Sequence, residues 1–315
     1  MMGGGWQRPT YLISVGAVLL LPFGLGPYGH FLLASILVYA LVGLSLSLLV
    51  GLAGQISIGH AGFWALGAYA SAVATVKLGA PFLLGIVFGG VVGGFFGTLV
   101  ALPALRVRGH YLAIATLGFS LVIQQVLFEW ESLTGGRQGM FVPRPQLFGF
   151  ALEDDFSYFY FLLAFVLLVL AGVRNFNGSH TGRALVALRM SETAAQCSGI
   201  GRARHLVIAF GLSGALAGVS GCLYAHLIGQ ISTDAFTLSA SLSFLTMAVV
   251  GGIRSPLGAV LGAAYLTLMP EVFRELREAQ MVVYGVSLIA CLRFFPDGFA
   301  GIPAQIVAWH RAAPK

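Results

Sequence analysis

The sequence is poor in charged residues and in cysteine, and each shortage excludes a class of protein. Only 9% of the 315 residues are Asp, Glu, Lys or Arg, whereas a soluble domain carries about 25%. The three cysteines, Cys197, Cys222 and Cys291, lack the spacing of a zinc site or a disulfide framework. We therefore expect three small buried cysteines, no metal site and no soluble globular domain.

Reactive and nucleotide-binding groups are missing as well. No paired acids and no nucleophile–base constellation stand inside the apolar runs, which argues against an enzyme. No segment fits G-x-x-x-x-G-K-[ST], so the chain is not expected to cradle the phosphates of ATP. The net charge of +6 does not indicate nucleic acid, because the positive residues stand in short loops between apolar runs.

Long hydrophobic runs are what the sequence does have. Hydrophobic residues make up 58% of the chain, and the mean hydropathy is +0.90. Such runs cross a bilayer as helices, because lipid offers the backbone no hydrogen-bond partners. We predict an all-α integral membrane protein with a single domain over residues 1–315. Its ten predicted transmembrane helices, some of them discontinuous, are 11–25, 31–50, 61–77, 82–103, 110–129, 157–173, 206–229, 239–252, 256–270 and 281–296.

Glycine is abundant, with 43 residues, and its placement is informative. Gly85, Gly89, Gly93 and Gly97 recur every four residues and so share one face of a helix. A stripe of this kind lets a neighbouring helix approach closely. We interpret it as a packing seam.

The charges in the loops predict the orientation. Arg106 and Arg108, the segment 174–205, Arg254 and the basic C-terminal residues all fall on one side of a ten-helix bundle. The positive-inside rule makes that side cytoplasmic, together with both termini. Five spans precede the sixth and five follow from it, which suggests a possible 5+5 inverted repeat.

The segment 51–60 joins two apolar spans without a charged residue. Its glycines disfavour a helix, and non-helical backbone at membrane depth must be buried in protein or line a wet cavity. Its residues Gly54, Gln55, Ser57 and His60 are therefore candidates for lining a solute pathway. The alternative is a tight turn whose polar side chains pack internally.

A second pair of candidates lies in the span 110–129. Thr116 and Ser120 stand one helical turn apart and are predicted to line the same pathway. In the alternative interpretation their hydroxyls bond back to carbonyls of their own helix.

The segment 174–205 is the long polar interruption between the two hydrophobic halves. It holds five arginines against one acid, Glu192. Thr181 is predicted to cap a first short helix, Ser191 to cap a second, and Gly199 to end it. The helices either rest on anionic lipid or form a socket for another protein. The adjacent Ala194 and Ala195 favour the socket, because they let another surface approach closely.

Six segments, in this order, resemble a known family, the LivM type of permease subunit in branched-chain amino acid ABC importers. They are GLAGQISIGHAGFWALGAY (51–69), LRVRGHYLAIATLGF (105–119), SLTGGRQGM (132–140), TGRALVALRMSETAAQCSGI (181–200), VVGGIRSPLGAVLGA (249–263) and LRFFPDGFAGI (292–302).

The resemblance implies a permease in a bacterial inner membrane that moves branched-chain or related small amino acids. Its partners would be a paralogous permease subunit, two cytoplasmic ATPase subunits that bind ATP and Mg, and a periplasmic binding protein. Thr193-Ala194-Ala195 and Gly199 align with the coupling motif of such importers, with Thr193 where that motif has Glu. The predicted ATPase-coupling residues are Arg183, Leu188, Arg189, Glu192, Thr193, Ala194, Ala195 and Gly199.

Two alternatives remain at this stage. Permeases of the same family for urea, amides or small carboxylates are alike at this level. A stand-alone channel or a secondary transporter is disfavoured, because ion coupling usually places ionisable residues inside the spans. Here the nearby acids Glu129, Glu271 and Asp297 stand only at span ends.

Overall fold

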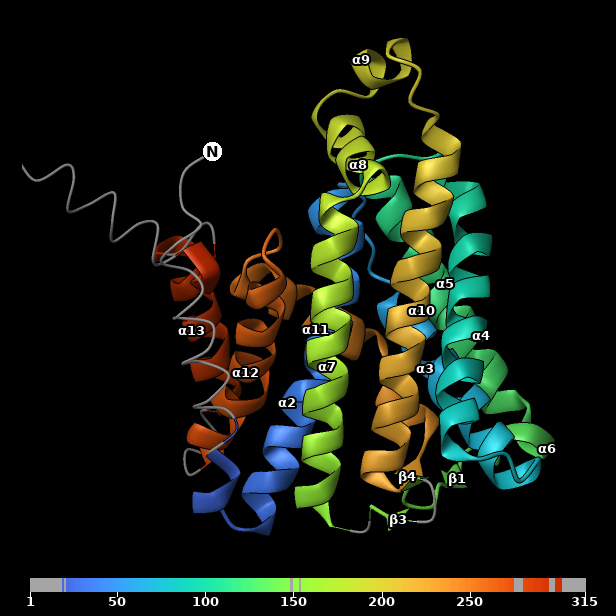
Figure 1. Cartoon of the computed structure of the whole chain (residues 1–315), viewed down its shortest axis with the longest axis vertical. Coiled ribbons are helices and arrows are strands. Elements are labelled where there is room, and N and C mark those ends of the chain that lie inside the picture. Colours follow the sequence, from blue (N-terminus) through green and yellow to red (C-terminus); the bar gives the residue numbers. More distant parts are fainter. Residues whose placement is uncertain are drawn as a thin grey trace, which may run out of the picture.

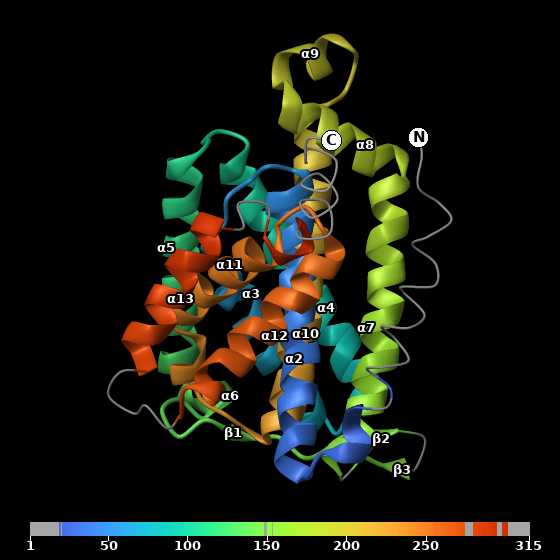
Figure 2. The same cartoon turned by 90° about the vertical axis from the view of Figure 1, so that its left-hand side faces the viewer.

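The computed structural model describes residues 19, 21–147, 150–152, 154–274, 280–294 and 298–301. They form a bundle of roughly parallel and antiparallel helices (Figures 1 and 2). The helices are η1 (Leu21–Gly24), α2 (Pro27–Leu46), η2 (Ser47–Leu52), α3 (His60–Ala72), η3 (Val73–Lys77), α4 (Phe82–Ala104), α5 (His110–Glu129), α6 (Glu131–Thr134), α7 (Asp155–Gly178), α8 (His180–Met190), α9 (Glu192–Cys197), α10 (Arg202–Ile228), η4 (Thr233–Phe236), α11 (Leu238–Gly251), α12 (Pro256–Val272), α13 (Gln280–Phe294) and η6 (Phe299–Gly301).

Five helical segments are long and apolar enough to cross a membrane: Pro27–Leu52, Phe82–Ala104, His110–Glu129, Asp155–Gly178 and Arg202–Ile228. The shorter apolar helices α11 and α12 have 14 and 17 residues. An all-α membrane protein is therefore confirmed, whereas the count of ten spans and the inverted repeat are not. The first predicted span, 11–25, lies largely outside the described residues.

Small residues hold the centre of the bundle together, where α10 packs against α2, α3 and α4. The glycine stripe of α4 is a packing seam, as predicted, and its residues Gly89, Gly93 and Gly97 face α10. A side chain at Gly93 would overlap the backbone of Gly214, and one at Gly218 would overlap the backbone of Gly89. Gly67 of α3 approaches Gly218 in the same way. The three helix backbones therefore meet at Gly218, with no room for any side chain.

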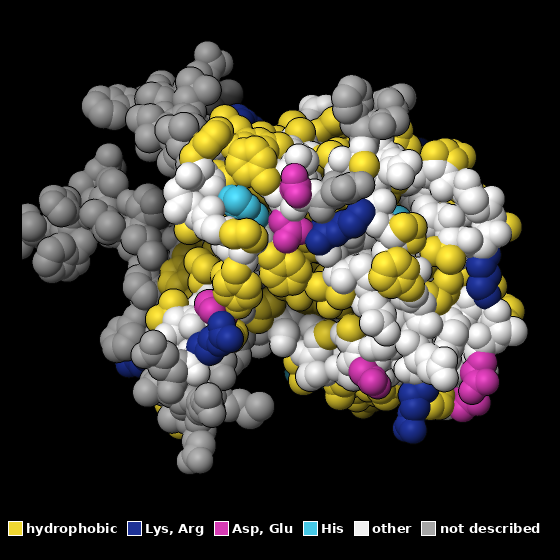
Figure 3. All heavy atoms as spheres, turned by 90° about the horizontal axis from the view of Figure 1, so that it is seen from below, with side chains coloured by type: hydrophobic (Ala, Val, Ile, Leu, Met, Phe, Trp, Pro, Cys, Tyr) yellow, Lys and Arg dark blue, Asp and Glu magenta, His cyan; other side chains and the backbone are white. Residues whose placement is uncertain are grey.

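Short strands close one end of the bundle. β1 (Met140–Phe141) pairs antiparallel with β4 (Gln230–Ile231), and β2 (Gln146–Leu147) pairs antiparallel with β3 (Phe150–Ala151). Figure 1 places them, with α6, at the end opposite α8 and α9. Seen from that end in Figure 3, a few acidic and basic side chains, some of them side by side, lie among apolar and uncharged atoms.

The basic loops gather at the other end, as their charges predicted. Arg108 reaches Glu192 of α9, and Arg202 donates to the carbonyl of Leu105 in the α4–α5 connection. The α11–α12 turn lies there too, since a side chain at Gly51 would strike the carbonyl of Ile253. The connections around Arg106, Glu192 and Arg254 therefore share one end of the molecule.

Candidate functional site

The polar segment between the two halves folds into two short helices that project beyond the bundle (Figure 1). The Ser179 hydroxyl accepts from the Gly182 N–H and caps α8, so the cap predicted at Thr181 was wrong by two residues. The reason is that α7 continues to Gly178 and Ser179 is the first extended residue after it. Ser191 caps α9, and Gly199 follows with φ of +83°, both as predicted.

We call α8 and α9 together the α8–α9 hairpin, residues 180–197. Its inner face is apolar, because Leu185 and Leu188 are buried against the bundle while Arg183 is exposed. This burial agrees with the predicted amphipathic helix. Within the described residues, the Arg183 guanidinium forms hydrogen bonds with the Gly178 carbonyl and the His180 ring, both close to it in the chain.

Arg189 ties the α8–α9 hairpin to the non-helical segment 53–59. Its guanidinium donates to the carbonyl of Gly51, and its aliphatic stem lies over Gly54, which has φ of +67°. Burial, reinforced by the nearby Arg254 guanidinium, lowers the pKa of Arg189. The end of α2 and the hairpin are thus connected by a charged hydrogen bond.

Glu192 ties the hairpin to a second element. Its carboxylate lies 2.8 Å from the Arg108 guanidinium and 2.9 Å from that of Arg202. The Arg202 side chain is only 13% exposed and also donates to the Leu105 carbonyl at 2.6 Å. The start of α9 is therefore bound both to the α4–α5 connection and to the start of α10.

The outer face of the hairpin is exposed in the part of the chain that the structure describes. Ala195 is buried, whereas Met190, Thr193, Ala194 and Cys197 are exposed. The prediction of three buried cysteines was wrong for Cys197, because it lies at the exposed end of a two-turn helix, and right for the other two. This small-residue tip is available to another protein.

The predicted break after α2 is present. The helical segment that begins with α2 ends in the π-helical turn η2. The chain then runs as Ala53–Gly59 back toward the middle of the bundle, and α3 begins at His60 (Figure 2). His60 is buried: its Nε2 lies 3.0 Å from Ser213 Oγ and its Nδ1 lies 3.2 Å from Ser57 Oγ. Because Ser213 Oγ donates to the Ser45 carbonyl, it accepts from His60 Nε2–H. This contact places a proton on Nε2.

Thr116 and Ser120 lie on the face of α5 that meets this segment. The Thr116 hydroxyl accepts from the Ile58 N–H at 3.0 Å and donates to the Ala113 carbonyl at 2.9 Å. A side chain at Gly59 would overlap the Thr116 backbone. The structure thus brings Ser57, His60, Thr116 and Ser120 together in one buried seam. That burial favours the second interpretation, internal packing, for Ser57 and His60. Thr116 also bonds back to its own helix, as in the alternative interpretation for that residue.

Gly54 and Gln55 lie elsewhere, near the end of the bundle that carries the hairpin. Gly54 is exposed, and Gln55 is half-buried with its amide donating to the Ala53 carbonyl. Of the six predicted pathway residues, these two are accessible from outside the bundle.

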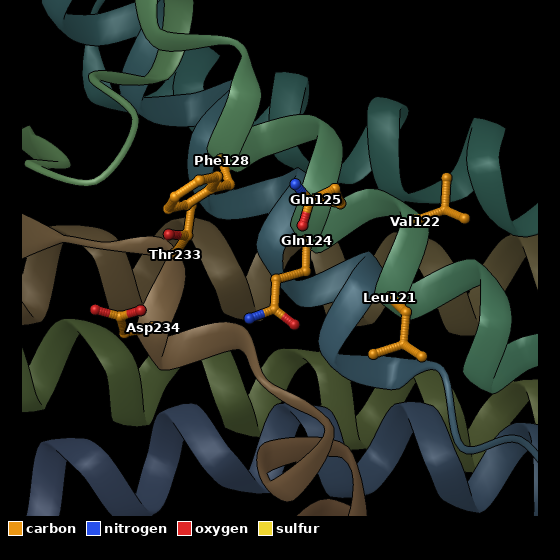
Figure 4. Close-up of a pocket in the computed structure, with 7 residues that line it drawn as sticks. All are labelled: Leu121, Val122, Gln124, Gln125, Phe128, Thr233 and Asp234. Atoms are coloured by element: carbon orange, nitrogen blue, oxygen red, sulfur yellow. The ribbon is translucent and has the colours of Figure 1, made fainter.

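The sequence analysis missed a polar groove on the outward side of α5. Gln124 is half-buried and Gln125 is exposed in a helix whose other exposed side chains, between its polar end residues His110 and Glu129, are apolar. In Figure 4 both reach toward the groove that α5 forms with η4, which contributes Thr233 and Asp234. The signal was available, since two adjacent glutamines interrupt an apolar run of membrane-spanning length.

In the described part of the chain, no three His, Cys, Asp or Glu residues converge. The candidate site therefore consists of the projecting hairpin, the end of the segment 53–59 that Arg189 contacts at Gly54, the buried seam, and the groove on α5.

Comparisons with known proteins give one consistent result. A family model described as "Branched-chain amino acid transport system / permease component" matches residues 30–292. The chain is 32% identical over 286 residues to the high-affinity branched-chain amino acid transport permease LivM of Salmonella typhimurium and to that of Escherichia coli K12, covering 83% of this chain and 67% of each relative. It is 27% identical over 292 residues to the permease LivH of Escherichia coli K12, covering 84% of this chain and 92% of LivH. No solved structure matches.

Proposed function

Because the chain belongs to the family of branched-chain amino acid transport permease components, we propose that it is a membrane subunit of an ATP-driven importer of branched-chain amino acids. A paralogous permease would pair with it, two ATPase subunits would bind ATP and Mg, and a periplasmic binding protein would deliver the substrate. The family is one of transport proteins and not of enzymes. In this account the contribution of the chain is conformational.

The connection of the α8–α9 hairpin to two other elements supports this proposal best. An ATPase that moves the hairpin would pull the end of α2 through Arg189 and the α4–α5 connection through Glu192. The first connection leads to the non-helical segment 53–59, and the second leads to α5. One movement outside the membrane would thereby change two elements inside it.

The coupling residues divide by the direction they face. The exposed Arg183, Thr193 and Ala194 would touch the ATPase, while the buried side chains of Leu188 and Ala195 would keep the shape of the hairpin. Arg189 and Glu192 transmit the movement, and Gly199 turns the chain into α10.

For the pathway, we propose that Gly54 and Gln55 line its cytoplasmic end. Ser57, His60, Thr116 and Ser120 would form the seam that opens or shifts when the hairpin moves. The hairpin end of the bundle is then cytoplasmic, with both termini on the same side, as its arginines suggest.

Arg189→Ala is expected to uncouple the transporter. The variant loses a charged hydrogen bond, worth about 1.5–3 kcal/mol, so substrate-stimulated ATP hydrolysis should fall about tenfold. Arg204→Ala is the matched control, because it removes the same charge from an exposed position at the start of α10, outside the α8–α9 hairpin. Equal losses in the two variants, at equal assembly, would argue against a transmitting role for Arg189.

Transport itself is tested with the complete complex in proteoliposomes. Leucine uptake should require ATP, the ATPase subunits and the binding protein together. Uptake without ATPases would instead indicate a channel or a secondary transporter. Uptake of urea, short amides or small carboxylates in place of leucine would assign the chain to one of the other substrates in this family.

A further inference from the structure

The groove on the outward side of α5 has the chemistry of a substrate site. Its volume is about 510 Å³, and Figure 4 shows the seven lining residues on α5 and η4. They are Leu121, Val122, Gln124, Gln125, Phe128, Thr233 and Asp234. In Figure 1, α5 ends beside α6, at the end of the bundle opposite the hairpin.

The polar residues of this groove distinguish α5 from α4. The large exposed side chains of α4 are all apolar, such as Val87, Val91 and Phe95, which suits a helix that faces lipid. On α5 the amides of Gln124 and Gln125 would be costly against lipid. Its outward side therefore fits a surface that faces water and a second protein.

One carboxylate in the groove is available to a cationic ligand. Within the described residues, no Lys, Arg or His forms an ion pair with Asp234, and its side chain is exposed. By contrast, the amide of Gln125 already donates to Glu129 at 2.7 Å. Asp234 and the Gln124 amide thus present an acceptor and a donor in the same groove.

We propose that this groove is an outer subsite for an α-amino acid with an apolar side chain, and that Asp234 is its specificity-determining residue. The Asp234 carboxylate accepts from the substrate ammonium, the Gln124 amide donates to the substrate carboxylate, and Leu121, Val122 and Phe128 contact the aliphatic side chain. The inference rests on the proposed function, because the second permease subunit must cover the open side of the groove.

The same chemistry separates amino acids from the other substrates of the family. Urea and short amides carry no ammonium group, so their N–H groups can donate to Asp234 only as neutral donors, without the attraction of an ion pair. Small carboxylates without an amine bring a negative charge toward the Asp234 carboxylate and are repelled. Asp234 thereby favours zwitterions in two ways, because it attracts their ammonium group and repels carboxylates that carry no amine.

Asp234→Asn tests the subsite in the complete complex with its binding protein. The number of leucine molecules imported per ATP hydrolysed should fall about tenfold, because a lost charged hydrogen bond weakens capture by about that factor. Binding-protein-stimulated ATP hydrolysis should persist, since the hairpin is untouched. Asp234→Glu should recover most of the import. The matched control, Glu131→Gln, removes an exposed acid at the same end that does not line the groove.

Three outcomes overturn the inference: import by Asp234→Asn at the stoichiometry of the unaltered complex, an equal loss in Glu131→Gln, or failure of Asp234→Glu to recover. These differ from failure of the proposed function, in which the unaltered complex neither imports leucine nor responds to the binding protein.

Discussion

A complex carrying Ala194→Arg is expected to lose nearly all of its substrate-stimulated ATP hydrolysis. Ala194 is exposed on the outer face of α9, next to the buried Ala195. A long charged side chain there would hold the ATPase off the small-residue tip, and a clash in a docked interface costs several kcal/mol. The measurement is ATP hydrolysis in proteoliposomes with and without the loaded binding protein, and the expected loss is about a hundredfold.

Ala203→Arg is the matched control for this variant. It places the same side chain at an exposed helical position at the start of α10, on the same end of the molecule but outside the hairpin. It should retain most of the stimulated activity. If both variants behave alike, the tip of α9 has no special role in coupling.

The second large effect is expected at Gly218. Replacing it with leucine places a branched side chain where the backbones of α3, α4 and α10 meet. Overpacking of a close-packed interior usually costs about 1–3 kcal/mol, and here the obstruction is backbone, which cannot rotate away. Gly218→Leu should therefore yield little monodisperse protein after detergent extraction and gel filtration.

Gly172→Leu makes the same exchange where the structure leaves space. Gly172 lies on the exposed side of α7, and nothing is within contact distance of an added side chain. Its yield and thermal midpoint should match those of the unaltered protein. Comparable yields of the two variants would mean that the glycine seam does not hold the bundle together.

The helices and the glycine seam could be predicted from the sequence because both depend on local pattern. The four-residue spacing from Gly85 to Gly97 is enough to show one face of one helix. That the partner face is Gly214 and Gly218 of α10 could not be predicted, because glycines occur in most of the apolar runs. The start of α8 and both ends of α9 were predicted to within two residues from their caps.

The contacts of the candidate site were harder to predict because they join distant parts of the chain. Arg189 and Gly51 are separated by 138 residues, and Arg108 and Glu192 by 84. No local pattern identifies such partners. The sequence also could not show which polar side chains are buried. Ser57 and His60 bond to each other inside the bundle, whereas Gln124 and Gln125 of α5 are accessible.

Cross-linking from Cys197 tests the central claim most directly. Cys197 is exposed on α9, whereas Cys222 and Cys291 are buried, so a photoactivatable maleimide should label Cys197 selectively in a complex whose partner subunits lack cysteine. Illumination is expected to join the chain to an ATPase subunit, in an amount that changes when ATP is added. Cross-links only to lipid or to the binding protein would contradict the account.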